Sequence, residues 1–395
     1  MKKFFMFAAM ASVALVSCVK NEPGAGLSGS GEQNLISFEA PILAPAVKSV
    51  NEIVQFPADS TFQIWAYYTQ SNFAGTAVTS NEYMNNVEIK YWDRDGGTNY
   101  KWTATDKYYW PNSGYLTFVG YAGTVTNADV VDTGLEFNYA VQAEADEDLL
   151  VSQVAYNLQR PAALDDHIQD NYTGQVQVQF EHALASLVFK VKSGVYKSND
   201  AGINTDLAVT KIEVIGVHNT GSFSQGFTNW ATGNQMVKPE ITTGDPASAV
   251  VTDGWSGQAG TATYTAFTSA SVGRQVLTGN LELVHDIDEP SEDPDYSVSN
   301  LIVLPQTIPG DATLKITYDF RNDSMADDVW ITGNTATAKL STDYVAAWMR
   351  GYRYTYNVTL TLDEITFDPE VSSWVDYVPA DRNNDHVADY PTSNS

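Results

Sequence analysis

The amino-acid sequence predicts an all-β protein built as two β-sandwiches in tandem. Windows rich in Val, Ile, Tyr, Phe, Trp and Thr recur along the chain and are separated by Gly, Asn, Asp and Pro, as strands and their turns are. No window keeps a 3.6-residue hydrophobic period over a dozen residues, so helices are not expected. A chain of 395 residues with 43% hydrophobic residues is long enough to form about two domains.

The first predicted domain covers residues 34–172. Residues 61–67 alternate apolar with polar or small side chains, the pattern of a half-buried strand. A polar stretch at 157–174 is predicted to be a connection. The strand-like windows before it are, in order, Leu35–Phe38, Thr61–Tyr67, Val87–Tyr91, Tyr100–Trp102, Tyr108–Tyr121 and Leu149–Ser152.

The second predicted domain covers residues 173–378, and a polar tail follows at 379–395. Residues 175–180 alternate strictly, which favours a strand with one buried face. Residues 222–275 are rich in Gly, Thr and Ser, and we expect long loops or short edge strands there. The remaining windows are His182–Val191, Leu207–Val217, Val276–Leu283, Asn300–Pro305, Thr313–Phe320 and Tyr352–Leu362.

The N-terminus has the pattern of a lipoprotein signal peptide. Two lysines and an apolar run lead to Leu15-Val-Ser-Cys18, and Cys18 is the only cysteine in the chain. The apolar run is too short to cross a bilayer as a stop-transfer helix. We predict a signal peptide at 1–17, lipidation (palmitate) at Cys18 and a flexible Gly/Ser tether at 18–33. The alternative is an ordinary signal peptide with a chance cysteine.

Charge and motifs argue against several functional classes. The net charge of −27 disfavours nucleic acid as a partner, because its binding depends on clustered Lys and Arg. None of the five histidines has metal-ligand spacing, and no nucleophile elbow or phosphate loop is present. His182 is interpreted as a packed, hydrogen-bonded residue. Asp381–Asp389 has oxygen ligands at calcium-loop spacing but lacks the glycine and final glutamate. We therefore predict no enzyme, no metal and no cofactor.

Five segments in this order resemble the fimbrillin family, the subunits of type V pili of anaerobic Gram-negative bacteria. An aromatic segment comes first, an apolar strand near the start of the second domain follows, and a Tyr-rich strand ends the series. The segments are Tyr108–Tyr121, Phe180–Phe189, Ile212–Phe223, Val303–Gln306 and Arg350–Leu360. Together they span nearly all of the chain that follows the signal peptide.

The resemblance implies two transthyretin-like β-sandwich domains and a structural role in cell-surface fimbriae that support adhesion. It also implies a lipid-anchored, surface-exposed precursor at the cell outer membrane. Its partners would be other fimbrial subunits and a host or bacterial surface ligand.

In this family a trypsin-like protease removes the first strand, and the C-terminal strand of the next subunit fills the groove by donor-strand exchange. The removable strand here would be Leu35–Ala40. The loop after it has one basic residue, Lys48, whereas the family's protease favours Arg. The open alternatives are an uncleaved lipoprotein that acts as a fimbrial anchor or accessory subunit, and a glycan-binding module with exposed aromatic residues.

The candidate donor strand is the alternating segment Ile365–Tyr377. Its apolar positions are Ile365, Phe367, Val371 and Trp374. An ordinary last strand of its own domain would show the same alternation. The pattern leaves both interpretations open.

Overall fold

The computed structural model confirms the all-β prediction. It describes residues 35–39, 41–43, 53–56, 58–73, 81–93, 100–131, 134–143, 145, 147–160, 175–195, 205–226, 254–269, 274–283, 301–326, 329–342 and 345–373. Across these ranges the regular secondary structure consists of strands β1 to β27, with no α-helix. Accordingly, none of the described residues form a helix long and apolar enough to cross a membrane.

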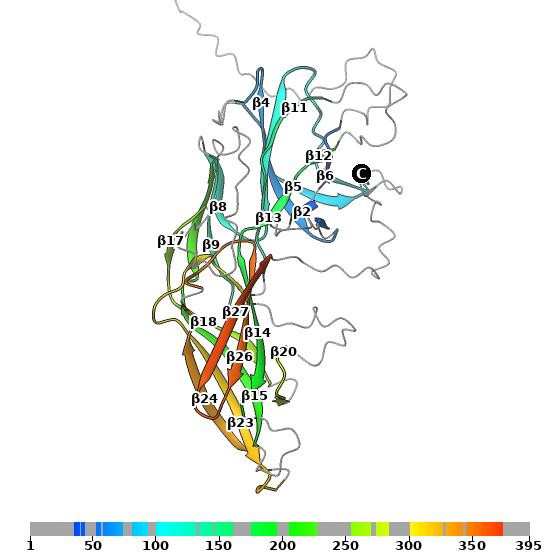
Figure 1. Ribbon diagram of the computed structural model, residues 1–395. Coiled ribbons are helices and arrows are strands. Elements are labelled where there is room, and N and C mark those ends of the chain that lie inside the picture. The colour runs from blue at the N-terminus through cyan, green and yellow to red at the C-terminus, as the bar shows by residue number, and fades with distance from the viewer. Residues whose placement is uncertain are drawn as a thin grey trace, which may run out of the picture.

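The largest sheet has eleven strands and occupies one end of the molecule (Figure 1). Its path is β12-β1-β6-β5-β4-β7-β10-β13-β2-β3, with β11 paired to β7. The first and eighth strands of this path, β12 and β13, are neighbours in the chain, so one short segment closes the sheet on itself. The strands are β1 (Phe38–Glu39), β2 (Pro41–Leu43), β3 (Ile53–Gln55), β4 (Thr61–Thr69), β5 (Glu82–Trp92), β6 (Lys101–Ala104), β7 (Tyr115–Ala122), β10 (Leu150–Ser152), β11 (Ala155–Leu158), β12 (Val176–Gln177) and β13 (Phe180–His182).

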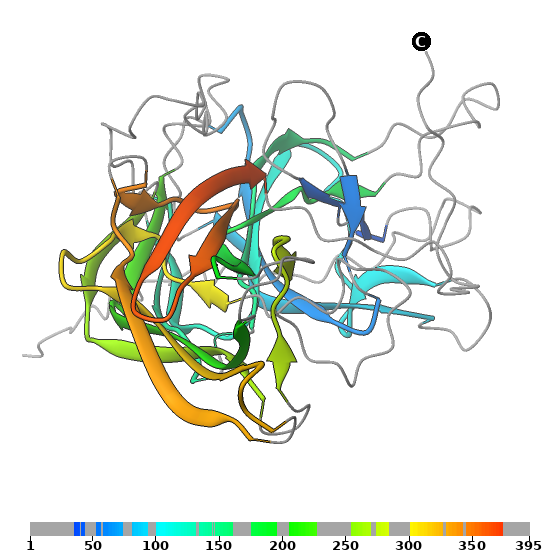
Figure 2. The same ribbon diagram turned by 60° about the horizontal axis from the view of Figure 1, so that its bottom comes forward.

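Two five-stranded sheets form the other end of the molecule. One has the order β20-β14-β26-β27 with β21 paired to β14, and the other has β18-β15-β23-β24 with β19 paired to β15. The first contains β14 (Ala185–Ser193), β20 (Glu282–Leu283), β21 (Leu301–Val303), β26 (Tyr352–Leu360) and β27 (Ile365–Ser373). The second contains β15 (Thr205–Val217), β18 (Ala262–Thr268), β19 (Gln275–Val276), β23 (Thr313–Asn322) and β24 (Ile331–Lys339). Figure 2 shows their orange and red strands on the side opposite the blue and cyan strands of the large sheet.

A four-stranded sheet joins strands from both predicted domains. Its order is β17-β16-β9-β8, and β9 pairs with β16 along its whole length, from Gly134 with Gly226 to Ala140 with Thr220. The strands are β8 (Thr126–Val131), β9 (Gly134–Ala140), β16 (Thr220–Gly226) and β17 (Trp255–Ala259). A last pair consists of β22 (Gln306–Thr307) and β25 (Ala347–Trp348).

The expectation of loops or short edge strands at 222–275 is wrong for residues 222–226 and is confirmed for β17 and β18, which lie at the edges of their sheets. β16 is a central strand, and β18 pairs with β15 from Lys211 to Val217. Four aromatic side chains among the Gly, Ser and Thr residues of this stretch are buried and anchor these strands in the core: Phe223, Trp255, Tyr264 and Phe267.

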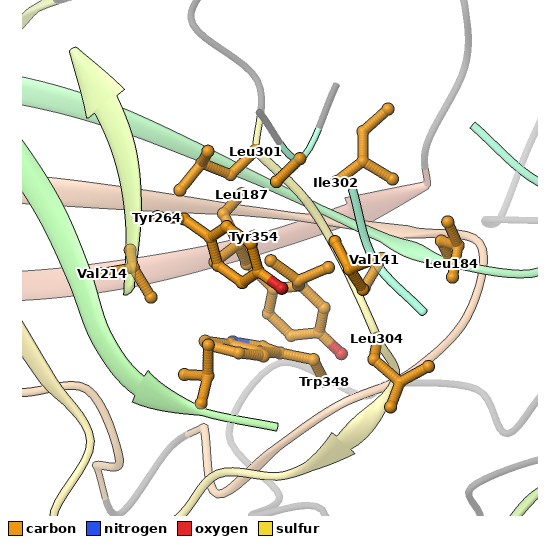
Figure 3. Close-up of a cluster of buried hydrophobic side chains, with 14 of the residues drawn as sticks. Val141, Leu184, Leu187, Val214, Tyr264, Leu301, Ile302, Leu304, Trp348 and Tyr354 are labelled. Carbon is orange, nitrogen blue, oxygen red and sulfur yellow. The ribbon is translucent and has the colours of Figure 1, made fainter. Parts of the chain in front are cut away.

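Two hydrophobic clusters fill the molecule. One lies inside the large sheet and is rich in Phe and Trp. The other runs from Trp65 in β4 to Ile365 in β27 and includes Leu187, Trp348 and Tyr354 (Figure 3). The division predicted at residues 172 and 173 stays a prediction. Strands from its two sides pair at β1 with β12, at β10 with β13 and at β9 with β16.

Candidate assembly site at the first and last strands

The structure describes only part of the predicted assembly machinery. Cys18, Lys48 and Trp374 lie outside the described residues. Ile365, Phe367 and Val371 are all in β27. The predicted first strand is described from Leu35 to Glu39. The site can therefore be built from the two strands themselves, and the predictions for Cys18, Lys48 and Trp374 stay predictions.

The N-terminal segment lies between two neighbours in the large sheet. On one side, Phe38 pairs antiparallel with Trp102 of β6, and the Ile36 N–H donates to the Tyr108 carbonyl at 2.9 Å. On the other side, Phe38 pairs parallel with Val176 of β12. The Ser37 carbonyl there accepts from the Val176 N–H at 2.8 Å. Because both edges are occupied, removing this segment would open a slot and not merely shorten an edge.

The inward face of this segment is closely packed. Ile36 and Phe38 are 3% and 1% exposed. The Phe38 ring lies 6.2 Å from the Phe62 ring and 5.7 Å from the Phe118 ring, and both pairs are edge-on. Aromatic pairs in this geometry add stability beyond their buried area. The slot therefore has an aromatic lining that would be exposed to water if the segment left.

β2 continues the same ladder beyond β1. Ile42 pairs parallel with Phe180 of β13, which is the same register as Phe38 with Val176. β2 also pairs antiparallel with β3, from Pro41 with Gln55 to Leu43 with Ile53. Lys48 lies in the chain between β2 and β3. A cut after Lys48 would therefore detach both β1 and β2 from the residues that follow.

The chain that pairs with β1 and β2 continues into a buried polar joint. Glu181 accepts hydrogen bonds from Arg350 at 3.3 Å and from Gln153 at 2.7 Å. Arg350 is 1% exposed, so this ion pair is shielded from solvent. His182 is also buried, and its Nδ1 lies 2.8 Å from Asp148 Oδ2. The interpretation of His182 as a packed, hydrogen-bonded residue is confirmed.

Glu181 and Arg350 were not predicted from the sequence as a buried ion pair. The available signal was a carboxylate inside an otherwise apolar strand, which must find a partner if it is buried. The joint connects β13, the partner strand of β2, with the turn that begins β26. β14 follows it and pairs parallel with β26 from Ser186 with Arg353 to Ser193 with Leu360.

The C-terminal strand β27 lies at the edge of its sheet. It pairs antiparallel with β26 along its whole length, from Ile365 with Leu360 to Ser373 with Tyr352. No described strand pairs with its other edge. Ile365 is buried, whereas Phe367 and Val371 are half-buried against the core. The residues between them point outward and are exposed: Thr366, Asp368, Glu370 and Ser372.

The neighbouring strand β26 contributes a buried tyrosine that contacts the apolar face of β27. The Tyr356 ring lies 5.2 Å from the Phe367 ring, edge-on, and stacks 5.5 Å from the Phe189 ring. The Trp348 indole N–H donates to the Tyr356 hydroxyl at 3.0 Å. Burial raises the pKa of Tyr356 well above its usual value, because the tyrosinate would lose its hydration there. The buried position beside Phe367 therefore favours the neutral form of Tyr356.

The described residues bring together no group of three or more His, Cys, Asp or Glu side chains that could hold a metal ion. The candidate assembly site consists of the N-terminal segment, which has a paired strand on each side, and of β27, which has a paired strand on one side. What these strands can do chemically is form and break backbone pairing and apolar contacts, which is the basis of β-augmentation.

Comparison with known proteins shows similarity to fimbrial proteins. The model of the family described as fimbrillin-like matches residues 50–374. A fimbrial protein from Bacteroides vulgatus has a solved structure that aligns with a TM-score of 0.51 at 18% identity, over 87% of this chain and 100% of that one.

Two further solved structures are of candidate cell adhesion proteins. The one from Bacteroides uniformis aligns with a TM-score of 0.45 at 15% identity over 86% of this chain and 98% of that one. The one from Bacteroides ovatus aligns with a TM-score of 0.43 at 14% identity, over 87% and 99%. A search of curated proteins found no match.

The family match covers most of the chain and includes all five segments on which the resemblance in the sequence rests. A family of this kind points to a structural protein with a fimbrial role. The chain belongs to the fimbrillin-like family.

Proposed function

We propose that this protein is a structural subunit of cell-surface fimbriae that assembles by strand exchange. A lipidated precursor is anchored in the outer membrane through Cys18, and cleavage after Lys48 frees the folded body from its lipid. The slot left by residues 35–43 then accepts the C-terminal strand of the next subunit. The assembled fimbrium supports adhesion to a host or bacterial surface.

The observation that carries this proposal is the double pairing of the N-terminal segment. It lies between β6 and β12, and its inward face is almost fully buried. Loss of such a strand leaves unpaired N–H and C=O groups together with exposed aromatic side chains, and both can be satisfied by an added strand. The segment also lies directly before the one basic residue of the following loop.

Limited trypsin treatment of the folded protein tests the proposal. We expect a new N-terminus at Ser49, followed by a ladder of SDS-resistant oligomers on unheated gels. The matched control is Lys48→Ala, which keeps the fold and should remain a monomer under the same treatment. Clipping at Lys48 without any oligomer would contradict assembly by strand exchange.

A second candidate is an uncleaved anchor or accessory subunit. Two observations favour it: the loop after β2 contains no arginine, and the first strand is tightly packed. In that case Cys18 is a permanent tether. Recovery of the lipidated, full-length N-terminus from purified fimbriae would support this candidate over the shaft subunit.

A further inference from the structure

The first and last strands carry nearly the same sequence. Ile36-Ser-Phe-Glu-Ala-Pro-Ile42 and Ile365-Thr-Phe-Asp-Pro-Glu-Val371 are identical at the first and third positions. The second, fourth and seventh positions exchange Ser for Thr, Glu for Asp and Ile for Val. The two segments lie in different sheets: β1 lies between two paired strands, and β27 lies at a sheet edge. Neither sheet requires the other's sequence, so the likeness calls for a shared binding position.

We propose that residues 365–371 of a second copy of this chain replace residues 36–42 in one fixed register, with Ile365 in the place of Ile36. This inference rests on the proposed strand exchange and adds the direction and the register of the donated strand. The added strand then runs parallel to β12 and antiparallel to β6, as β1 does.

The side chains fit this register position by position. Ile365 enters the site in which Ile36 is 3% exposed, and Phe367 enters the site in which Phe38 is 1% exposed. Phe367 thereby meets the rings of Phe62 and Phe118, which surround Phe38 in the intact chain. Both aromatic contacts are recovered without a change of volume, which a closely packed core requires.

The backbone hydrogen bonds also fit. The Ile365 N–H takes over the bond that the Ile36 N–H makes to the Tyr108 carbonyl. The Thr366 and Asp368 carbonyls take over the bonds that Ser37 and Glu39 accept from Val176 and Val178. These three backbone hydrogen bonds of the N-terminal segment are therefore kept.

Pro369 fixes the direction and register of the added strand, because proline has no N–H to donate. In the proposed register Pro369 stands opposite residue 100, just before β6 begins at Lys101, so no ladder bond is lost. In the reversed direction, with Phe367 again at the Phe38 site, Pro369 would stand at the Ile36 site. The hydrogen bond to the Tyr108 carbonyl would then be lost.

Shifts by two residues fail for separate reasons. A shift toward the N-terminus of the added strand places Asp363 in the buried Ile36 site, where an unpaired carboxylate is costly. A shift in the other direction places Pro369 opposite Trp102, within the β6 ladder, and Phe367 in the smaller Ile36 site. Only the unshifted register satisfies both the side chains and the backbone.

The added strand also serves β3. In the proposed register Glu370, Val371 and Ser372 replace Pro41–Leu43, which pair with Ile53–Gln55. The donated strand exchanges an edge position with one partner for a slot with partners on both sides. The gain in pairing and burial favours transfer once the slot is empty.

Disulfide trapping between two copies tests the register. In the intact chain Glu39 pairs with Gln177, and both side chains face outward, with Gln177 Nε2 donating to Glu39 Oε2 at 3.4 Å. One chain carries Gln177→Cys and the other carries Asp368→Cys, and both carry Cys18→Ser. The chains are mixed, cleaved after Lys48 and oxidised. We expect a disulfide-linked heterodimer on non-reducing gels, while each chain oxidised alone shows how much homodimer forms.

Thr366→Cys and Glu370→Cys are the matched variants, since both side chains are exposed on the same face as Asp368. Each would lie about 6–7 Å farther along the strand from residue 177. This displacement exceeds what a disulfide can span. Glu39→Cys with Gln177→Cys in one uncleaved chain is the positive control for the geometry.

The outcomes separate the two claims. Crosslinking at 368 above that at 366 and 370 supports the register. Oligomers that crosslink equally well or better at 366 or 370 would overturn the register and leave strand exchange standing. Cleaved chains that stay monomeric would overturn strand exchange and the register with it.

Discussion

β1 and β27 share a sequence pattern but differ in how firmly they are held. The N-terminal segment has a neighbour on each side, and its Phe38 is 1% exposed. β27 has one neighbour, and its Phe367 is only half-buried. The same alternation of side chains is thus fully buried in β1 and only partly buried in β27, at the edge of its sheet. If the proposed exchange takes place, the number of paired neighbours, and not the sequence of the strand, distinguishes the segment that is held in place from the one that is donated.

The two surroundings also differ in how they connect to the rest of the fold. The strand β12, which pairs with β1, continues through β13 into β14, and β14 pairs with β26, the neighbour of β27. Glu181 of β13 and Arg350, just before β26, form a buried ion pair along this connection. Breaking a buried ion pair by removing one partner is costly, so the Glu181–Arg350 pair helps to hold β13 against the start of β26. Among the described strands β27 pairs with β26 alone, and it packs on the core through buried Ile365 and half-buried Phe367 and Val371.

The largest effect on this comparison is expected from Phe38→Ala. The substitution removes a fully buried aromatic side chain and should lower the free energy of unfolding by about 3–5 kcal/mol. Glu39→Gln, one residue away and partly exposed, is the control and should change it by less than about 0.5 kcal/mol. Equilibrium urea unfolding of both variants measures the difference. Equal stability of Phe38→Ala and the parent would contradict the closed core.

Phe367→Ala should have a smaller effect in the intact, uncleaved chain. Its ring is half-buried, so we expect a loss of about 1–2 kcal/mol, which is smaller than the loss for Phe38→Ala. Thr366→Ala, on the exposed face of the same strand, should be nearly neutral. The same urea experiment gives the ratio of the two Phe→Ala losses. A ratio near one would mean that β27 is held as firmly as β1.

The smallest effect concerns pH. The pKa of Tyr356 is raised by burial, so the folded state binds its proton more tightly than the unfolded state does. The stability that depends on its neutral form is complete below a pH of about 10 and is lost as the pH rises above that value.

Tyr356→Phe removes this titration, and the variant should lose less stability than the parent on moving to alkaline pH. At neutral pH it should cost about 1 kcal/mol through the lost hydrogen bond from Trp348. Urea unfolding on both sides of pH 10 checks the prediction. Identical alkaline losses in the two proteins would show that Tyr356 does not support the apolar face of β27.

The fold class was predictable because alternation and turn residues are local signals. β14, β15, β23 and β26 lie where the apolar windows predict strands. The central position of β16 was missed because small polar residues surround its buried aromatic side chain, Phe223. Pairing of β9 with β16 links residues far apart in the chain, and no local pattern specifies such a partner.

The candidate site was predictable only in part. The alternation of Ile365, Phe367 and Val371 marked a strand but could not distinguish an edge from a donor. The parallel ladder of 38–42 with 176–180 depends on tertiary packing, so only the structure shows that the first strand fills a slot. Once the slot is seen, the likeness of the two terminal strands acquires a physical meaning.

The most direct test mixes two chains that can each play only one part. Lys48→Ala keeps its own β1 and can only donate, while a cleaved chain with Phe367→Asp can only accept, because an aspartate cannot enter the apolar Phe38 site. Native mass spectrometry of the mixture should show a one-to-one heterodimer, and each chain alone should remain a monomer. No heterodimer in the mixture, or oligomers of Lys48→Ala alone, would contradict exchange of the first strand for the last.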